Sequence, residues 1–428
     1  MKVLVLGSGA KDHAIAWWFS KSKFIEGLYV APSNPGTASF AVNLPDVDPS
    51  DKDQVLAACR KYGIDFVFID TEGPLQTGVI DYLNAHGIDT FGAPGYAIKL
   101  DNDRKFSREF ATRHGIPIPD YHIFSDEKSL KAFLEGNTGK MFTIKPNGLS
   151  PSRVMISSDD TETLLDYSRN LLAKGDVVVE DYIDGKHATI SILLDNEGFF
   201  RLPVCYEYTK REHTDRGEGI PTGGMGAVCP LPVEPEIREL IRDRIVMPTF
   251  KGLDEENLFY KGVLTFSITL TDDGPVLLDY HVRFNDPATQ AMVAIIKNDL
   301  CELMMAMKNN TLKDIKRELN GKSSVAVVIA SDGYPEDSTV GHRLNPIPEH
   351  NMSNAIDTGT LLFFGAVESR LDGIYTTGGR AATIVGVDKN IMLANSRAYN
   401  AIDLVQFDGS WHRSDIGVKF FENMTNTN

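Results

Sequence analysis

A strand that ends in a polar turn is the most informative stretch of this 428-residue sequence. It reads Leu277-Leu278-Asp279-Tyr280-His281-Val282-Arg283-Phe284-Asn285-Asp286-Pro287-Ala288-Thr289-Gln290. The alternation of side chains along a strand predicts that Asp279, His281 and Arg283 share one face. A carboxylate beside a second ligand suits a Mg²⁺ ion that holds nucleotide phosphates, and an arginine two residues further on suits an anionic substrate. A surface strand with scattered charges is the alternative, and the rest of the chain decides between them.

Composition indicates an ordinary folded protein. Hydrophobic residues make up 42% of the chain and aromatic residues 9%, and this length suits about two to four domains. The cysteines are widely spaced, without a CxxC pair, at Cys59, Cys205, Cys229 and Cys301. This spacing predicts a reduced cytoplasmic protein with free buried thiols, without disulfides or structural zinc.

Net charge narrows the range of partners. The chain carries a formal charge of -16, which disfavours general binding to nucleic acid or anionic membranes, although a local basic pocket can still hold a phosphate. No apolar run approaches membrane-spanning length. We therefore expect small-molecule partners, with no nucleic acid and no membrane.

The N-terminus has the outline of a phosphate cradle. An apolar strand at 2–6 runs into the turn Gly7-Ser8-Gly9, and a helical stretch covers 13–19. Junctions of this kind also occur purely for packing. Further strands at 28–30 and 66–70, with helices at 52–62 and 78–86, predict a parallel α/β domain. Its ligand loops should lie beyond the carboxyl ends of the strands, at 34–37 and 72–75.

The middle of the chain reads as mixed α/β structure. We expect a charged helix over 101–114 and strands at 142–145, 154–157 and 177–180. Lys145 closes the first of these strands among apolar residues, so an inward-pointing ammonium group that binds phosphate is favoured over a surface lysine. The turn Glu180-Asp181-Tyr182-Ile183 follows the third strand, and its backbone could meet an adenine edge.

Antiparallel strands are predicted to follow. They are expected at 188–194, 199–206, 264–270 and 276–282, with a Gly- and Thr-rich loop over 221–227 among them. A last group of strands at 325–330, 360–366 and 381–386 and a helix over 391–404 predict a further domain.

Several motifs in fixed order identify a family. They are Gly7-Ser8-Gly9-Ala10-Lys11-Asp12-His13-Ala14-Ile15-Ala16-Trp17, Ala31-Pro32-Ser33-Asn34-Pro35-Gly36-Thr37, Thr222-Gly223-Gly224-Met225-Gly226-Ala227, Arg283-Phe284-Asn285-Asp286-Pro287, Thr377-Gly378-Gly379-Arg380 and Ser414-Asp415-Ile416-Gly417. In this order they resemble the phosphoribosylamine-glycine ligases, also called glycinamide ribonucleotide synthetases, of the ATP-grasp superfamily. The resemblance covers nearly the whole chain.

This resemblance implies a domain plan. It combines α/β and α+β structure in an ATP-grasp fold. A parallel α/β (pre-ATP-grasp) domain would span 1–101 on the phosphoribosyl side, and the ATP-grasp domain 102–322, with a nucleotide-clamping subdomain at 115–187. A small C-terminal domain would span 323–428. We expect a monomer, with a dimer as the alternative.

The resemblance also implies an activity, with ATP and Mg²⁺ or Mn²⁺ as cofactors. ATP would phosphorylate the carboxylate of glycine, and the amine of 5-phosphoribosylamine would attack the acyl phosphate. The products would be glycinamide ribonucleotide, ADP and phosphate, in the second step of purine synthesis. A carboxylate is a poor electrophile until it becomes a mixed anhydride, so catalysis is mainly positioning and electrostatics.

The matching motif positions imply roles for individual residues. Catalysis would use Arg283, Asp286 and Lys145. ATP would be bound by Arg104, Lys145, Arg153, Glu180, Tyr182, Ile183 and His187. The substrates would be bound by Gly7, Gly9, Asn34, Gly36, Thr37, Asp215, Gly223, Gly224, Met225 and Gly226. The metal would be held by Asp279 and His281.

The sequence departs from the family pattern mainly on the ATP side. Family members follow the strand lysine with a mobile glycine-rich loop, whereas 146–154 here contains two prolines and fewer glycines. Arg104 stands for a lysine, and His187 for the acidic residue that holds the ribose. Asp279 and His281 replace Glu and Asn, a pair that suits Mn²⁺ better than Mg²⁺.

Further departures lie on the substrate side. Asn285 and Ala288 stand where Gly and Glu are usual, and Ala10-Lys11-Asp12 replaces Gly-Arg-Glu.

Two other functions compete with this ligase. One is an ATP-grasp ligase for another amine, acid or nucleotide, and the other is a nucleotide-binding regulatory protein without catalysis. The altered loop favours these alternatives, whereas the intact Arg283 and Asp286 pair favours catalysis.

Overall fold

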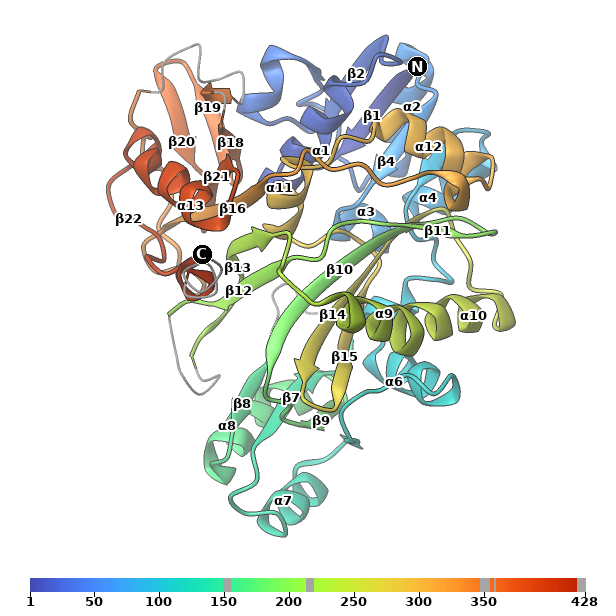
Figure 1. The fold of residues 1–428 in the computed structure, drawn as a ribbon, viewed down its shortest axis with the longest axis vertical. Helices are drawn as coiled ribbons and strands as arrows, with labels where there is room; N and C mark the ends of the chain where they lie inside the picture. The colour runs from blue at the N-terminus through green and yellow to red at the C-terminus, as the bar shows by residue number, and fades with distance from the viewer. Residues whose placement is uncertain (149–154, 213–218, 347–354, 358, 422–428) are drawn as a thin grey trace.

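The computed structural model describes residues 1–148, 155–212, 219–346, 355–357 and 359–421. Its N-terminal sheet is parallel and has the strand order β3-β2-β1-β4-β5. Its strands are Lys2–Leu6 (β1), Gly27–Ala31 (β2), Val42–Asn43 (β3), Phe66–Ile69 (β4) and Asp89–Phe91 (β5). Because the strand order reverses at β1, the loops after β1 and β4 begin at the same sheet edge, where open α/β sheets bind ligands. The predicted parallel domain is confirmed (Figure 1).

Helices of this region follow local signals in the sequence. They are Ala10–Ser20 (α1), Lys52–Tyr62 (α2), Glu72–Gln76 (α3) and Val79–Ala85 (α4), with a 3-10 turn at Pro35–Ser39 (η1). The side chain of Asp51 caps α2 by accepting from the amides of Asp53 and Gln54, and Gly63 ends it with a φ of 66°. This pairing of an acidic N-cap with a left-handed glycine explains why the predicted bounds of α2 were exact.

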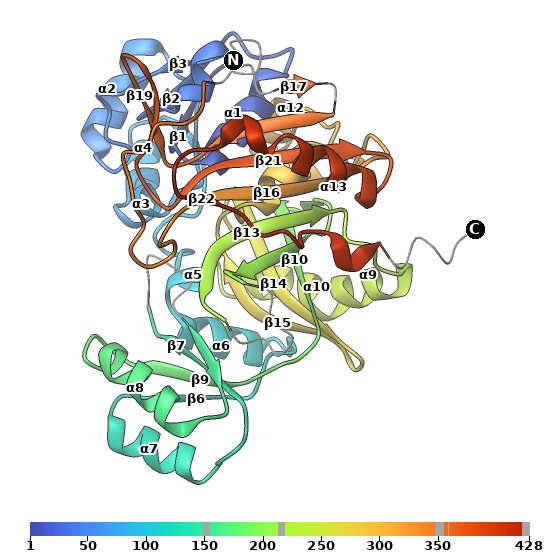
Figure 2. The same cartoon turned by 90° about the vertical axis from the view of Figure 1, so that its left-hand side faces the viewer.

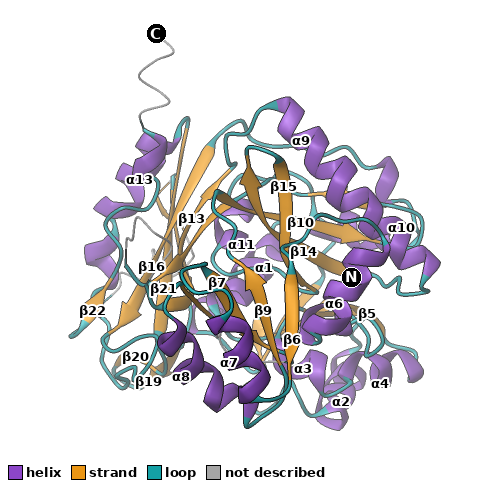
Figure 3. Ribbon diagram, turned by 90° about the horizontal axis from the view of Figure 1, so that it is seen from below, coloured by secondary structure: helices purple, strands orange, loops and turns teal. Residues whose placement is uncertain are grey.

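A small antiparallel sheet forms one end of the molecule. Its order is β6-β9-β7-β8, and its elements are Tyr121–Phe124 (β6), Glu127–Glu135 (α7), Phe142–Pro146 (β7), Ile156–Ser158 (β8), Thr161–Leu172 (α8) and Val177–Asp181 (β9). Helices α7 and α8 pack on this sheet, far from the N-terminal sheet (Figures 1 and 2). Seen from below, they lie in front of its strands (Figure 3). Helices Lys99–Asn102 (α5) and Arg104–Arg113 (α6) precede it, so the single helix predicted over 101–114 is interrupted at Asp103, which caps α6 through the amide of Phe106.

A second antiparallel sheet has the order β11-β10-β14-β15. Its strands are Lys186–Leu194 (β10), Phe199–Arg201 (β11), Gly262–Thr271 (β14) and Gly274–His281 (β15). The neighbouring helices are Pro235–Ile241 (α9), Met247–Glu255 (α10), Ala288–Val293 (α11) and Leu300–Lys308 (α12). A π-helical turn lies at Arg242–Val246 (η2) and a 3-10 turn at Leu312–Asp314 (η3). The predicted metal strand is therefore an edge strand of this sheet.

The third large sheet joins two regions that are distant in sequence. Its order is β12-β13-β16-β21-β18-β17, with β22 beside β16. Its strands are Tyr206–Lys210 (β12), Pro221–Cys229 (β13), Ser323–Ser331 (β16), Ala355–Asp357 (β17), Thr360–Phe364 (β18), Arg380–Asp388 (β21) and Ser410–Trp411 (β22). The hairpin Val367–Arg370 (β19) and Gly373–Thr376 (β20), the helix Ile391–Asn400 (α13) and the 3-10 turns Ile402–Val405 (η5) and Val418–Phe420 (η6) complete it.

Two predictions fail in this sheet. The expected loop over 221–227 is strand β13, which pairs with both β12 and β16. The single strand expected over 199–206 is divided into β11 and β12, which belong to different sheets. The break contains Pro203, which lacks the amide that a continuous ladder needs.

Two further features concern the cysteines and the lengths of the apolar helices. All four cysteines are free and buried. Among the described residues, no helix is both long and apolar enough to cross a lipid bilayer.

Candidate active site

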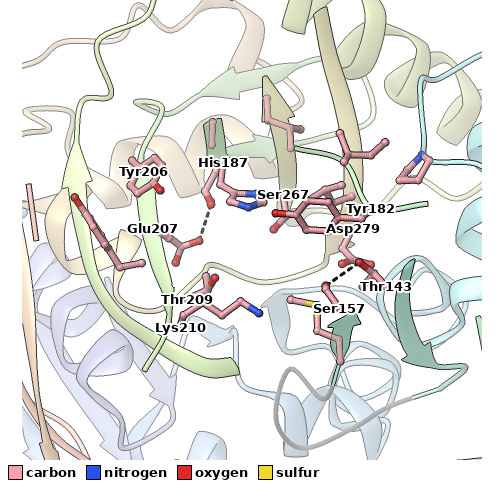
Figure 4. Close-up of a pocket in the computed structure, with 18 of the residues that line it drawn as sticks. Thr143, Ser157, Tyr182, His187, Tyr206, Glu207, Thr209, Lys210, Ser267 and Asp279 are labelled. Atoms are coloured by element: carbon pink, nitrogen blue, oxygen red, sulfur yellow. Dashed lines mark hydrogen bonds between the residues drawn. The ribbon is translucent and has the colours of Figure 1, made fainter. Parts of the chain in front are cut away.

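A cavity of about 600 Å³ lies where the small sheet faces the sheet of β10, β14 and β15. Its lining includes the predicted nucleotide and metal residues Arg104, Lys145, Glu180, Tyr182, Ile183, His187, Asp279 and His281. Figure 4 shows Tyr182 and Asp279 on one side of this space and Tyr206 and Glu207 across from them. The fold therefore brings the predicted residues together from the strands β7, β9, β10 and β15, the turn after β9 and the helix α6.

A cluster of opposite charges occupies the inner side of the cavity. Lys145 Nζ lies 2.9 Å from Asp279 Oδ2 and 3.0 Å from Glu180 Oε2. Arg108 Nη2 lies 3.3 Å from Asp279 Oδ1 and 2.5 Å from Glu180 Oε1. Arg104 Nε stands further away, at 3.8 Å from Asp279 Oδ1. Lys145 thus points inward, as predicted, although carboxylates surround its ammonium group.

This cluster keeps Asp279 ionised. Burial alone would raise the pKa of Asp279, but Lys145, Arg108 and Arg104 hold it well below its usual range. Arg108 is itself fully buried. A buried arginine between two carboxylates is costly to separate, so the contacts of Arg108 anchor the inner side of the cavity.

The two predicted metal ligands extend from the same strand. His281 Nδ1 lies 3.3 Å from Asp101 Oδ1, and His281 Nε2 lies 3.2 Å from Ser267 Oγ. A carboxylate on one ring nitrogen is the usual way to direct the other nitrogen toward a metal. Among the described residues, no group of three or more His, Cys, Asp or Glu side chains is arranged for a metal. Both oxygens of Asp279 are already paired with cations, and both ring nitrogens of His281 have hydrogen-bond partners. An ion held by these two side chains would displace some of these contacts and take its remaining ligands from nucleotide phosphates.

The hinge side of the cavity contains Tyr182, Ile183 and His187. The amide of Tyr182 donates to the Met141 carbonyl at 3.2 Å, which fixes the turn after β9. His187 Nδ1 lies 3.2 Å from Thr269 Oγ1. The side chain of Glu180 is buried and faces the charged cluster. Only the backbone of Glu180 could therefore meet an adenine edge.

The first-domain loops are held by internal hydrogen bonds. Asn34 Nδ2 donates to the carbonyls of Ser8 and Phe364, both at 2.8 Å, and Thr37 is fully buried. At Gly7 the φ of 146° and a would-be Cβ 2.2 Å from Asp12 Cγ admit only glycine. The Gly9 amide donates to Asp12 Oδ2 at 2.9 Å.

The predicted residues Gly7, Gly9, Asn34, Gly36 and Thr37 therefore form one connected structure. Gly36 packs against His13, where a Cβ would lie 1.9 Å from the ring. The side chains of Asn34 and Thr37 fix the loop.

The turn after β15 is tied to the first domain. Arg283 forms an ion pair with Glu72 and lies 3.8 Å from Asp101. The Phe284 amide donates to Asp70 Oδ1 at 2.9 Å, and Lys11 Nζ lies 2.6 Å from Asp70 Oδ2. The residues after β4 thus face Arg283, although 72–75, predicted as a loop, begin the helix α3.

The same turn is tied to the C-terminal sheet by Arg380. Arg380 Nη1 lies 3.2 Å from Asp286 Oδ1 and donates to the carbonyls of Gly223 at 2.9 Å and Gly224 at 3.3 Å. Asp286 also accepts from Gln290 Nε2 at 2.8 Å. A Cβ on Gly224 would lie 2.4 Å from the Asp286 carbonyl oxygen, so glycine is required.

The residues of the Gly223 to Gly226 segment are closely packed, each against different neighbours. Met225 is fully buried against Val328 and Ala330. A Cβ on Gly226 would lie 2.5 Å from Ile416 Cδ1. Only the Gly223 and Gly224 end lies beside the turn of Asp286. Arg153 and Asp215, two other predicted site residues, lie outside the described residues, as does most of the altered loop over 146–154.

Three residues near the site were not indicated by the sequence patterns. Arg108 is four residues from Arg104, so helix spacing places both on one face of α6. Asp101 contacts His281, the Val282 amide and Arg283. Arg380 belongs to a quoted motif, but nothing in the sequence placed it beside Asp286.

Comparisons with known proteins cover nearly the whole chain. Models of the phosphoribosylglycinamide synthetase family match the N domain at residues 1–101, the ATP-grasp (A) domain at 102–289 and the C domain at 324–419. The crystal structure of phosphoribosylamine-glycine ligase from Thermotoga maritima superimposes with a TM-score of 0.81 at 24% identity, covering 97% of this chain and 100% of that one. The biotin carboxylase domain of Hydrogenobacter thermophilus 2-oxoglutarate carboxylase, solved with MgADP and bicarbonate, has a TM-score of 0.69 at 15% identity, covering 96% and 91%.

Sequence relatives extend over the same length. The phosphoribosylamine-glycine ligase of Rhizobium meliloti is 32% identical over 424 residues, which cover 97% of this chain and 98% of that protein. That of Chlorobaculum tepidum is 30% identical over 429 residues, covering 98% and 100%. The trifunctional purine biosynthetic protein of Chironomus tentans is 32% identical over 436 residues, and the match spans 98% of this chain but 31% of that protein. This chain belongs to the phosphoribosylglycinamide synthetase family and has its ATP-grasp fold.

Proposed function

We propose that the chain is a phosphoribosylamine-glycine ligase, which uses ATP to join glycine to 5-phosphoribosylamine. The observation that carries this proposal is the junction around Asp286. Arg380, the Gly223 and Gly224 carbonyls and the Arg283 turn meet there, and the strand that ends in this turn also lines the charged cavity. Family membership over the full length supports the same conclusion.

The charged cluster suggests how ATP would be received. We propose that the triphosphate replaces Asp279 and Glu180 as the main partner of Lys145 and Arg104, which lie on the cavity wall. Phosphate oxygens accept charge-assisted hydrogen bonds as carboxylates do. Arg108, fully buried, would remain with Glu180 and keep the cluster in place.

The substrate side would act by positioning. Arg283 would attract the anionic substrate or acyl phosphate, and Asp286 would orient the amine of phosphoribosylamine. Arg380 holds Asp286 and the two glycine carbonyls in one geometry. The amine would then attack the acyl phosphate directly. This step depends on correct placement of the two groups and needs no covalent enzyme intermediate.

Asp279 and His281 would hold a divalent ion. When bound, this ion offsets the charge on the transferred phosphoryl group. Because an imidazole is a softer donor than the usual oxygen, we expect Mn²⁺ to support activity at least as well as Mg²⁺. A metal titration with a strong preference for Mg²⁺ would contradict the role of His281. Asp279→Ala should abolish ligation, and full turnover in that variant would contradict the metal assignment.

The proposed reaction is tested by omitting substrates. Purified protein is mixed with ATP, glycine and freshly generated phosphoribosylamine, and ADP is measured with each substrate left out in turn. We expect ADP and glycinamide ribonucleotide only in the complete mixture. ADP formation that does not depend on glycine or phosphoribosylamine would favour a ligase with other substrates. Nucleotide binding without ADP formation would favour a regulatory protein.

A further inference from the structure

Glu207 is a buried acidic residue between the nucleotide cavity and the Arg283 to Asp286 turn, and the roles proposed above do not include it. Its side chain lines the cavity, yet the residue is only 4% exposed. Figure 4 shows Glu207 on the side of the cavity opposite Asp279. A carboxylate removed from water is costly unless it is hydrogen-bonded, so the contacts of Glu207 indicate its role.

Two neutral side chains from different parts of the fold donate to the same oxygen of Glu207. The hydroxyl group of Thr189, on β10, donates to Glu207 Oε2 at 2.5 Å. The side-chain amide of Asn285 also donates to Glu207 Oε2, at a distance of 2.8 Å from Nδ2. Both donors are buried. Glu207 therefore connects β10 with the turn after β15.

The backbone around Glu207 is fixed by contacts of its own. Glu207 pairs with Ala227 of the neighbouring strand β13. Two residues before it, Cys205 exchanges backbone hydrogen bonds of 2.8 and 2.9 Å with Thr189. The Cys205 thiol lies 3.8 Å from the carbonyl oxygen of Ala288, so the start of β12 lies beside the start of α11. Glu207 thus contacts the turn from a well-anchored strand.

Asn285 belongs to the turn itself. Its carbonyl accepts from the amide of Thr289 at 3.1 Å and from the Thr289 hydroxyl group at 2.7 Å, which ties it to the first turn of α11. Asp286 follows it directly. Glycine, which is usual at position 285 in the family, has no side chain that could reach Glu207. The contact therefore depends on one of the departures of this sequence from the family pattern.

We propose that Glu207 is a positioning residue, which holds the Arg283 to Asp286 turn in place through Asn285. This inference rests on the proposed function, because the turn is taken to position the substrates. A small displacement of Arg283 and Asp286 would impair the reaction, since placement of the reacting groups carries much of the catalysis. The hydrogen bond from Asn285, rather than contact between Glu207 and a substrate, is what the proposal requires.

The test compares Glu207→Ala, Glu207→Gln, Asn285→Ala and the double alanine variant. Glu236→Gln, at an exposed position in the first turn of α9, is the control. Steady-state kinetics give kcat and the KM for each substrate. Hydrogen exchange of the amides at 284–291, measured by mass spectrometry, reports on the turn without requiring turnover. Thermal unfolding shows that each variant is folded.

Both single alanine variants should lower kcat about tenfold, because the turn loses its hold on β12. In Asn285→Ala the KM for ATP should stay within about twofold, since Asn285 does not line the cavity. The double variant should lose no more than either single variant, because Glu207 acts through Asn285. Glu207→Gln keeps an oxygen for the Asn285 amide, so its kcat should stay within about threefold of wild type.

The amides at 284–291 should exchange about tenfold faster in both single alanine variants and at the wild-type rate in Glu236→Gln. If Glu207→Ala does not fold, Asn285→Ala alone tests the contact, because it removes only the donor.

Three results would overturn the positioning role. They are losses of kcat that multiply in the double variant, equal losses in Glu207→Gln and Glu207→Ala, and unchanged exchange over 284–291 in the alanine variants. The exchange result holds whether or not the protein ligates glycine. Wild-type protein that forms no glycinamide ribonucleotide, while the alanine variants exchange faster, would refute the proposed function and support the hold of Glu207 on the turn.

Discussion

The substrate side and the nucleotide side of this site are held by different kinds of contact. On the substrate side, the Arg283 to Asp286 turn is fixed from outside, by Asp70 and Glu72 of the first domain and by Arg380 of the last sheet. On the nucleotide side, Lys145, Arg108, Asp279 and Glu180 neutralise one another. The substrate side is thus held in place by neighbouring domains, whereas the nucleotide side, in the function proposed above, would exchange carboxylates for phosphates when ATP binds.

The largest effect is expected from a change on the substrate side alone. Asp286→Ala should lower kcat/KM about 10²- to 10³-fold, the range for losing one preorganised polar group at a reacting centre. ATP affinity, measured by calorimetry, should stay within about twofold because Asp286 does not line the cavity. Asp272→Asn, at the exposed β14 to β15 turn, is the control. A tenfold loss of ATP affinity in Asp286→Ala would break the distinction between the two sides.

A smaller effect should follow at the contact with the C-terminal sheet. Arg380→Lys keeps a positive charge, but its shorter side chain replaces Nη1, the single nitrogen that contacts Asp286 and the Gly223 and Gly224 carbonyls. We expect kcat to fall about 30-fold, with the KM for ATP unchanged, because a displacement of the turn impairs positioning. Steady-state kinetics with each substrate varied would measure this. A rise in the KM for ATP with unchanged kcat would show that Arg380 serves the nucleotide side.

Asp101 lies between the two sides of the site, since it contacts both His281 and Arg283. Asp101→Asn should weaken Mn²⁺ binding in the presence of ADP about tenfold, as expected when a metal-bound imidazole loses its carboxylate partner. Electron paramagnetic resonance gives the affinity, and spin-echo modulation detects a directly bound imidazole nitrogen. His281→Asn should remove that nitrogen signal. Wild-type protein that binds Mn²⁺ without it would refute metal ligation by His281.

Local patterns predicted most of the fold, because capping and alternation act over a few residues. The N-cap Asp51 and the left-handed Gly63 mark α2, and the apolar run of β1 marks a buried strand. Glycines misled the prediction at 221–227. There they serve close approaches inside a strand, Gly224 to Asp286 and Gly226 to Ile416, which arise only from tertiary packing.

The site was predictable where one strand or one motif carries it. Asp279, His281 and Lys145 line the cavity as alternation and inward orientation suggested. Arg108 and Asp101 were missed because a buried charge is recognisable only once its partners are known.

The most direct test of the ligase follows a labelled oxygen. The protein is incubated with ATP, phosphoribosylamine and glycine carrying ¹⁸O in its carboxylate, and the released phosphate is examined by ³¹P nuclear magnetic resonance. An acyl-phosphate route transfers a carboxylate oxygen to phosphate, so we predict ¹⁸O-labelled inorganic phosphate formed together with glycinamide ribonucleotide. Unlabelled phosphate, or ADP formed without glycinamide ribonucleotide, would contradict the proposed function.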